Sequence, residues 1–523
     1  MRVHRSISKA CAALILSGAA MLAVNAPAAG IGDFTGQSDV GSVVPPGTAR
    51  YDAGRQVYTL TAAGANTWYH VDDFHFLWRR AAGDVALTAA VSFPQPTYDH
   101  APNPHRKGLL MIRQSLDSGS AYVDAAPHGS GLTALQYRRE RGANSADIEL
   151  NIDLPRTVRL EKRGDTFTMY LSMHGEPLHP VGASVQLHLR EPFYVGLGAV
   201  SHDVDTTDTV EFAGVSLQTL PPVRARGRIV RYSTLQTIQI EDQFRRSMMI
   251  RTSAGYFTSA NWAPGGKSIY LYDRGRIERI PYLTPEAGGE PQAVDTAGLT
   301  DCAGDFGLSP DGQWLAVSCT MRHGAPHVVF LLPVAGSGSP RQVTTGAASS
   351  YFHAWSPDSR TIAFTRGHDL AADIYTIAIG GGEERRLTRD TVNDDPSYTP
   401  DGQWIYFDSS RSGSTQLWRM RPDGSAAEQL TDDDHVNTSP QIAPDGRTLV
   451  FVSYPPGRQA GMGPAALKVM AAGDGLIRTV VDFQGDRGSL GSYAWGDNNH
   501  VAFVSYRDLP PDDDATHIRR TNQ

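Results

Sequence analysis

A short turn of fixed composition recurs through the second half of this 523-residue chain. Each copy places Pro and Asp, then Gly or Ser, directly before an apolar strand, and successive copies lie about 45 residues apart. A period of this length with several short strands per unit is typical of the blades of a β-propeller. The four full copies are Ser309–Gly312, Ser356–Ser359, Thr399–Gly402 and Ala443–Gly446, with a degenerate copy at Ala263–Gly266 and one that lacks proline at Trp495–Asn498.

The chemistry of each unit supports this interpretation. Proline presets φ for a turn and glycine supplies a left-handed position, so the tetrapeptide predicts a tight hairpin. Apolar strands follow it, as in Trp314–Val317 and Thr361–Phe364. A third strand and a Gly-rich turn come next, and a polar fourth strand ends near a Leu-Thr pair such as Leu387–Thr388. The fold class is therefore predicted to be all-β.

The two ends of the repeat region predict how the ring closes. The sixth unit supplies only two strands, near Tyr493–Trp495 and Val501–Val504. Residues 228–250 hold a strand pair outside the repeats, which includes Ile229–Val230 and Ile238–Ile240. We expect this pair to complete the last blade and remove its exposed edge, which gives six blades over residues 225–507. Residues 508–523 are expected to form a disordered tail.

These repeats resemble the WD40-like Pro-Asp repeats of the TolB-like six-bladed propeller family. The segment Ser409–Gly413, followed by Gln416–Trp418, looks like the crossing from the second to the third strand in that family. The resemblance covers residues 225–507 and implies the fold. It does not by itself imply a function, because one fold hosts many sites.

The N-terminus predicts export. Arg2, Arg5 and Lys9 precede an apolar run, and Ala26–Ala28 fits a small-residue cleavage site, so residues 1–28 are expected to be a signal peptide. The protein should then be periplasmic or secreted, with no transmembrane segment in the mature chain and most simply a monomer. The formal net charge of −8 becomes more negative without the leader, which argues against a nucleic-acid partner.

Two cysteines, Cys302 and Cys319, remain in the mature chain and flank one of the Pro-Asp turns almost symmetrically. In an oxidising compartment this arrangement favours a cross-strand disulfide.

A second β domain is expected in front of the propeller, over residues 31–220. About ten strands are predicted between Val85 and Leu217, with a clear hairpin turn at Gly164–Asp165. Lys107–Gln114 together with Tyr122–Asp124 is similar to concanavalin-type jelly rolls, which implies a carbohydrate-type surface. The catalytic Glu-x-Asp-x-x-Glu pattern of glycosidases of this type is absent. Candidate aromatic residues for stacking on sugar rings, each of which could equally be core, are Trp68, Tyr69, Trp78, Tyr98 and Tyr137.

Polar side chains of the propeller gather on one predicted face, at the entry to each innermost strand and in the loops between strands two and three. As metal ligands we consider Asp305, Asp394 and Asp395, with calcium as the possible ion. The same aspartates could instead only cap turns. The candidate ligand-binding residues are His353, Asp394, Asp395, Arg411, His435 and Asn437.

Two functions remain open. The preferred one is a non-catalytic binding protein that recognises a glycan or a protein partner in the cell envelope. The alternative is a polysaccharide lyase or glycosidase at the propeller mouth, with His353 or His435 as base or metal ligand and Arg366 or Arg411 as carboxylate clamp. An enzyme requires several of these groups to converge, whereas a scaffold leaves them scattered. The Gly-x-Ser-x-Gly elbow of propeller-gated peptidases does not occur.

Overall fold

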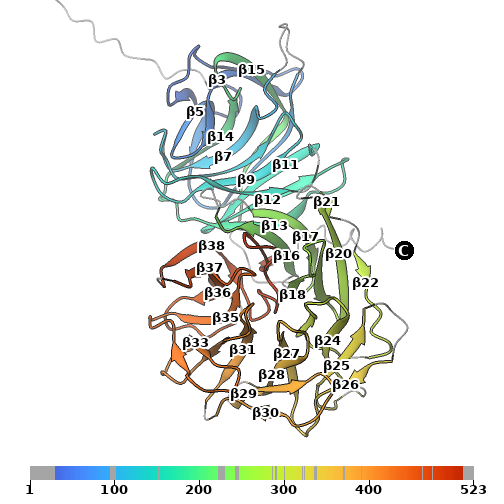
Figure 1. Cartoon of the computed structure of the whole chain (residues 1–523). Helices are drawn as coiled ribbons and strands as arrows, with labels where there is room; N and C mark the ends of the chain where they lie inside the picture. The colour runs from blue at the N-terminus through green and yellow to red at the C-terminus, as the bar shows by residue number, and fades with distance from the viewer. Residues whose placement is uncertain are drawn as a thin grey trace, which may run out of the picture.

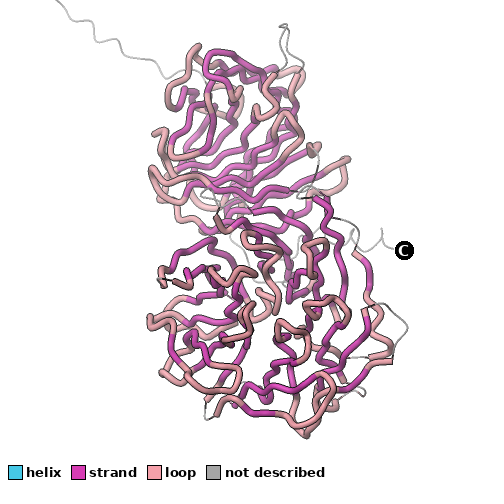
Figure 2. Tube along the Cα trace, viewed as in Figure 1, coloured by secondary structure: helices cyan, strands magenta, loops and turns pink. Residues whose placement is uncertain are grey.

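A computed structural model of the chain describes most of its residues and is all-β. The described residues are 30–94, 102–150, 152, 154–221, 230–241, 247–284, 287–288, 291–299, 301–320, 322, 324–334, 339–368, 371–389, 391–461, 463–473 and 475–509. They contain strands and loops but no helix, and so no helix that could cross a membrane (Figure 2). The predicted signal peptide lies outside the described residues, as does the predicted tail beyond Leu509.

Five sheets of the second half are separate propeller blades, arranged around a ring (Figure 1). In each blade the chain runs from the innermost strand outward. The blades comprise β18 (Phe257–Trp262), β19 (Ser268–Asp273), β20 (Arg276–Thr284), β21 (Ala287–Gly288) and β22 (Gln292–Ala293); β23 (Phe306–Leu308), β24 (Trp314–Cys319), β25 (Val328–Pro333) and β26 (Arg341–Gln342); β27 (Ser350–Trp355), β28 (Thr361–His368), β29 (Ala371–Ala378) and β30 (Arg385–Arg386); β31 (Asn393–Tyr398), β32 (Ile405–Ser409), β33 (Gln416–Met420) and β34 (Glu428–Gln429); and β35 (Val436–Ile442), β36 (Thr448–Tyr454), β37 (Gly463–Ala471) and β38 (Ile477–Gly485).

The Pro-Asp turns connect the first and second strands of these blades, as the repeat predicts. Asp311 Oδ1 accepts the backbone N–H of Gln313 at 3.0 Å, and the hydroxyl of Ser309 accepts that of Trp314 at 3.0 Å. Gly312 takes a left-handed φ of 70°. The side chains thus satisfy the turn's own N–H groups, which explains why Asp and Ser or Thr recur there.

The predicted pairing of the two chain ends is confirmed. β16 (Val230–Gln239) pairs antiparallel with β39 (His500–Leu509), with Ile238 opposite Val501. Val501 also forms a bridge to Trp495, and β16 pairs on its other side with β17 (Ser247–Ala254). The first two residues of the predicted tail, Asp508 and Leu509, belong to β39.

The prediction of six blades is wrong, because the described residues form five blades as sheets of their own. The strands that close the ring, β16, β17 and β39, do not form a separate sheet. The outer edge of β17 pairs in parallel with β10 (Ala146–Leu150) of the N-terminal domain, so these strands continue into an eleven-stranded sheet. Pairing with β10 covers an edge that an isolated blade would expose to solvent.

The N-terminal domain is a sandwich of two sheets (Figure 1). Its first sheet is the rest of the eleven-stranded one and its second sheet has seven strands. The first contains β1 (Gly36–Val40), β4 (Asn66–Trp68), β5 (Val71–Ala81), β14 (Phe193–Val200), β7 (Lys107–Arg113), β8 (Tyr122–Pro127), β9 (Thr133–Arg138) and β10; the second contains β13 (His179–Gln186), β12 (Thr166–Ser172), β11 (Thr157–Arg163), β6 (Val85–Ser92), β15 (Asp203–Thr219), β3 (Val57–Gly64) and β2 (Thr48–Asp52).

The core of the sandwich extends to the propeller. It is built from side chains of both sheets, such as Leu110 and Leu160, and it includes Met249 of the propeller strand β17. An ion pair between Arg139 and Asp482, with Nη2 and Oδ2 at 3.5 Å, adds a second contact between the two halves. The sandwich and the propeller therefore share both a sheet and a hydrophobic core.

Candidate functional site

A cavity of about 360 Å³ opens at the centre of the propeller ring. Its walls come mainly from the innermost strands of the blades and from the segment between β38 and β39. The lining residues are Tyr256, Thr258, Ser259, Tyr272, Gly304, Asp305, Tyr351, His353, Thr365, Gly367, Val392, Asp394, Asp395, Asp408, Thr415, Thr438, Ser439, Gln441, Ala460, Arg487, Gly488, Leu490, Gly491 and Ser492. The structure thus brings Asp305, His353, Asp394 and Asp395 of the sequence candidates to one cavity.

His353 lies between two carboxylates from the neighbouring blade. Its Nδ1 is 3.2 Å from Asp395 Oδ1, and its Nε2 is 3.3 Å from Asp394 Oδ1. Nε2 is buried and makes no hydrogen bond of good geometry with the described residues. The imidazole is therefore in contact with two carboxylates, and its contact with Asp394 is longer than a strong hydrogen bond.

Local irregularities in the innermost strands produce this arrangement. The pairing of β27 with β28 shifts between Phe352 and Ala354, and that of β31 with β32 shifts between Asp394 and Ser397. Asp395 adopts a left-handed φ of 51°. A β-bulge inserts one residue and redirects its side chain, which is how these strands turn polar groups toward the ring centre.

A second layer of polar groups lies behind the first. Ser439 donates its hydroxyl to Asp395 Oδ2 at 2.6 Å and its backbone N–H to Asp408 Oδ2 at 3.1 Å. Thr365 donates its hydroxyl to Asp394 Oδ1 at 2.8 Å. These hydroxyl and amide donors fix the carboxylates in place while adding no positive charge.

The protonation of the site follows from its acidity. Burial disfavours the charged imidazole, but the carboxylates of Asp394 and Asp395 outweigh it and raise the pKa of His353 well above its usual range. Burial likewise opposes ionisation of Asp394, yet contact with His353 lowers the pKa of that carboxyl. Burial and then repulsion by Asp395 and Asp394 raise the pKa of Asp408 well above its usual range. The site therefore contains more carboxylate than its own cations neutralise.

The possible metal ligands at the propeller mouth differ from those of the expected calcium site. Among the described residues, one group of His, Cys, Asp and Glu side chains brings three ligand atoms within 4.8 Å of one another, namely His353, Asp394 and Asp395. Asp305 lines the cavity but is not in this group. Calcium prefers six to eight oxygen ligands, whereas a mixed set of imidazole and carboxylates suits manganese or another transition ion better.

The remaining sequence candidates lie outside the cavity lining. Arg411 donates to Ser409 and Asn393 and lies over Phe407 and Trp418, so it stabilises its own blade.

Asn437 donates its side-chain amide to Gln416 and Asp433, and His435 Nδ1 is 2.9 Å from Asp434 Oδ1. Arg366 is held by Glu384 and Ser350. These positions strengthen strand ends and loops around the ring.

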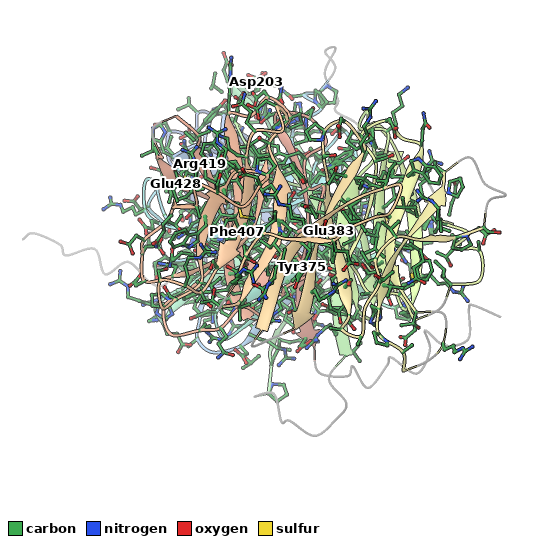
Figure 3. All side chains as sticks on the ribbon, turned by 60° about the horizontal axis from the view of Figure 1, so that its bottom comes forward. Asp203, Tyr375, Glu383, Phe407, Arg419 and Glu428 are labelled. Carbon is green, nitrogen blue, oxygen red and sulfur yellow. A yellow bond between two sulfur atoms is a disulfide. The ribbon has the colours of Figure 1, made fainter. Side chains whose placement is uncertain are left out.

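Charged pairs on the outer strands of the blades serve the same structural purpose. Arg419 of β33 pairs with Glu428 of β34, and the two side chains are seen close together in Figure 3. The guanidinium of Arg419 also lies 4.4 Å from the ring centre of Trp404. Such pairs are frequent in this chain and do not mark a site.

Asp408, Ser439 and Thr365 were not predicted from the sequence. Asp408 follows Ile405–Phe407 in an otherwise apolar strand, and an acidic residue in such a strand was the available signal. Ser439 and Thr365 are ordinary strand residues by sequence. Their role depends on register between neighbouring blades, which a single sequence does not give.

Comparisons with known proteins agree with this fold. The family model for the TolB β-propeller domain matches residues 307–470. An uncharacterised protein of Agrobacterium fabrum, Atu1656, is 36% identical over 268 residues, which is 50% of this chain and 89% of that protein. The Tol-Pal system protein TolB of Bordetella pertussis is 41% identical over 58 residues, which is 11% of this chain and 13% of TolB.

Among solved structures, a TolB candidate from Agrobacterium tumefaciens is 34% identical to this chain, with a TM-score of 0.49. The match covers 54% of this chain and 100% of the chain in that structure. The repeats, the blades and the family match define the second half of the molecule as a TolB-like β-propeller. The chain belongs to the same family as the Agrobacterium fabrum protein, which it matches along nearly the whole of that protein's length.

Proposed function

We propose that the protein is a non-catalytic binding protein of the bacterial envelope whose propeller mouth receives a positively charged group of its ligand. The single observation that carries the proposal is the cavity itself. Its ionisable lining consists of the acids Asp305, Asp394, Asp395 and Asp408 and the bases His353 and Arg487. A basic side chain entering the mouth would be attracted by this excess of carboxylate and would gain charge-assisted hydrogen bonds.

The same geometry argues against the lyase alternative. A lyase for acidic sugars needs a cationic clamp for the substrate carboxylate next to its base. The proposed clamps, Arg366 and Arg411, are engaged with Glu384, Ser409 and Asn393 and do not line the cavity. The ionisable residues that do line the cavity are mostly acidic, which would disfavour an anionic substrate.

Several finer points belong to the same proposal. We assign the sandwich to the concanavalin-like jelly rolls, as Lys107–Gln114 suggests. The predicted leader over residues 1–28 and the matches to Tol-Pal proteins support a periplasmic or secreted protein with a protein partner; the glycan partner and the monomeric state stay predictions.

Calorimetric titration of the full chain tests the preferred function. The probes are a short oligolysine peptide, a matched oligoglutamate peptide and an acidic oligosaccharide, at low and at moderate salt. We expect only the basic peptide to bind, and we expect salt to weaken its binding. The double substitution Asp394→Asn and Asp395→Asn should reduce affinity at least about tenfold, because charged hydrogen bonds contribute about 1.5–3 kcal/mol each.

Asp432→Asn is the matched control, since Asp432 is an exposed aspartate outside the cavity lining. Binding of the acidic probes with no binding of oligolysine would show the proposal to be wrong.

A divalent cation is a second candidate ligand, favoured by the close approach of ligand atoms from His353, Asp394 and Asp395. Binding would require the imidazole to lose its proton, so affinity for Mn²⁺ should increase with pH. The test compares melting temperature with Mn²⁺, Ca²⁺ and EDTA for the wild type and for His353→Asn. A metal-dependent rise that persists in His353→Asn would place the ion elsewhere.

A further inference from the structure

A cluster of three histidines lies at the edge of the sandwich, in the other half of the molecule from the propeller mouth. It consists of His105, His128 and His202, which come from three separate segments of the chain. The ring centres of His105 and His202 are 5.4 Å apart, and those of His105 and His128 are 6.3 Å apart. We propose that this histidine cluster binds a divalent transition-metal ion of the zinc type.

The backbone around the cluster is tied together by one side chain. Asn103 donates its amide to the backbone carbonyl of His202 at 3.1 Å and accepts the backbone N–H of His105 at 2.9 Å. The backbone of Gly129, next to His128, donates to the carbonyl of Arg106 at 2.8 Å. Three otherwise separate loops are thus held in one arrangement, which fixes the positions from which the imidazoles extend.

The tautomer of His128 is also fixed. Its Nδ1 lies 2.9 Å from the carbonyl oxygen of Ala126 and 3.1 Å from that of Leu132. Because carbonyl oxygens only accept hydrogen bonds, Nδ1 must carry the proton and Nε2 must carry the lone pair. This is the usual arrangement of metal-binding histidines, which donate their other ring N–H to a backbone carbonyl or a carboxylate.

His202 provides the second observation that points to a metal-binding site. It is a non-glycine residue with a left-handed φ of 62°, a conformation that costs about 1–2 kcal/mol and requires an explanation. Its Nδ1 is buried and has no hydrogen-bond partner among the described residues. A buried ring nitrogen without a partner, in a strained position beside two other imidazoles, is what a histidine awaiting a metal would show.

Charges of both signs lie near the cluster, and the cations among them are engaged by other side chains. Of the nearby cations, Arg106 is paired with Asp208 at 2.8 Å, and Lys107 is bound to Asn66 and Gln136. Asp203, the neighbour of His202, adds a negative charge beside the rings.

The imidazole nitrogens of the cluster indicate which kind of metal ion it would bind, because softer ligands favour transition metals. Imidazole nitrogens suit zinc, copper and nickel, whereas calcium and magnesium prefer oxygen. Metal–nitrogen distances of about 2.0 Å require the rings to be closer together than they are in the structure. His105 is exposed and can turn toward the other two rings, while the buried His128 and the constrained His202 stay in place.

Metal titration of the full-length chain without a polyhistidine tag, after treatment with EDTA and desalting, tests this inference. Zn²⁺ binding is followed by melting temperature and calorimetry, and Co²⁺ binding by its visible absorption. We expect one Zn²⁺ per chain at the cluster and a Co²⁺ spectrum typical of nitrogen ligands. His105→Ala and His202→Asn should each weaken binding at least about tenfold, and asparagine tolerates the left-handed backbone at position 202.

Two controls separate the cluster from other sites. His188→Ala removes an exposed histidine of the same domain, and His353→Asn changes the propeller mouth; neither should alter Zn²⁺ binding at the cluster. Absence of saturable Zn²⁺ binding in the wild type would overturn the inference. Unchanged binding in both His105→Ala and His202→Asn, or complete loss in His353→Asn, would overturn it as well.

Discussion

Two clusters of charge among the described residues, one around Asp72 and one around His353, differ in how completely their polar atoms are satisfied. In the sandwich, Asp72 accepts hydrogen bonds from Arg138 at 2.6 and 2.9 Å and from Arg113 at 3.2 Å, and all three side chains are fully buried. At the propeller mouth, the His353 imidazole contacts Asp394 and Asp395 at 3.2–3.3 Å, and these carboxylates border a cavity.

The groups around the two clusters also differ in how many hydrogen bonds they provide. Arg138 also donates to the backbone carbonyls of Tyr69, Ser118 and Ser120, so it fastens two loops to the sheet. Asp408 at the mouth has Ser439 N–H as its donor and two other carboxylates as neighbours. A satisfied buried network stabilises one conformation, whereas an unsatisfied one that borders a cavity is positioned to gain from a ligand.

The largest effect expected from this comparison is that of Asp72→Asn. The substitution leaves the guanidinium groups of Arg113 and Arg138 buried without a counter-charge, and we expect it to reduce the free energy of unfolding by about 3–5 kcal/mol. Urea unfolding of the full chain measures the change. Asp394→Asn is the matched substitution at the mouth, where the side chain is 40% exposed, and it should reduce stability by less than about 1 kcal/mol. Equal losses would mean that both clusters are structural.

Asp408→Asn should have the opposite effect and increase the free energy of unfolding. The amide keeps an oxygen for the backbone N–H of Ser439 and removes an acid whose pKa is raised on folding, which costs stability above its ordinary pKa, so we expect stability at pH 7 to increase by about 1–2 kcal/mol. Binding of the basic probe should weaken in the same variant. A loss of stability like that of Asp72→Asn would contradict a mouth arranged for a ligand.

The pH dependence of stability should distinguish the mouth as well. The pKa of His353 is raised in the folded state, so its contribution is complete below its ordinary value of about 6.5 and is lost as pH rises through the folded value. The slope attributable to it reaches at most about 1.4 kcal/mol per pH unit.

Lys107 in the sandwich acts in the opposite direction, since burial lowers its pKa to about 8 and stability is regained above that value. The measurement is therefore the difference between wild type and His353→Asn in urea unfolding from pH 6 to 9. Parallel curves for the two proteins would show that His353 is not held charged by its neighbours.

Much of the propeller follows from local chemistry, and that is why the sequence predicts it. Pro310, Asp311 and Gly312 determine a turn by themselves, and the same turn repeated at a fixed period implies a ring of blades. The pairing of β16 with β39 was also predictable, because strands left over at both ends of the repeats have each other as partners.

The parallel pairing of β10 with β17 was not predictable in this way. It joins residues about 100 positions apart, and nothing in the residues Ile148–Leu150 specifies Ser247–Met249 as their partner. The strands β1–β5 were missed because their alternation is interrupted by turns and polar residues, as in β2 and β4.

The site was predicted in part for a similar reason. His353, Asp394 and Asp395 lie at the entries of innermost strands, which the repeat places at the mouth. Asn437 also lies at the entry of an innermost strand and Arg411 lies in a loop on the same predicted face, but their side chains bond within or between blades. Which way a side chain turns depends on bulges such as that at Asp395, and a repeat pattern does not encode them.

The smallest predicted effect tests whether burial, and not the number of ion pairs, distinguishes the arginine network around Asp72. Arg141 pairs with Asp117 at 2.7 Å close to that network, but its side chain is 77% exposed. Water competes for such a pair and salt screens it, so Arg141→Ala should change the free energy of unfolding by less than about 0.5 kcal/mol. The measurement is urea unfolding at low and high salt beside Asp72→Asn. A loss above about 2 kcal/mol would mean that exposed and buried pairs contribute alike in this domain, and the contrast with the mouth would then need another explanation than desolvation.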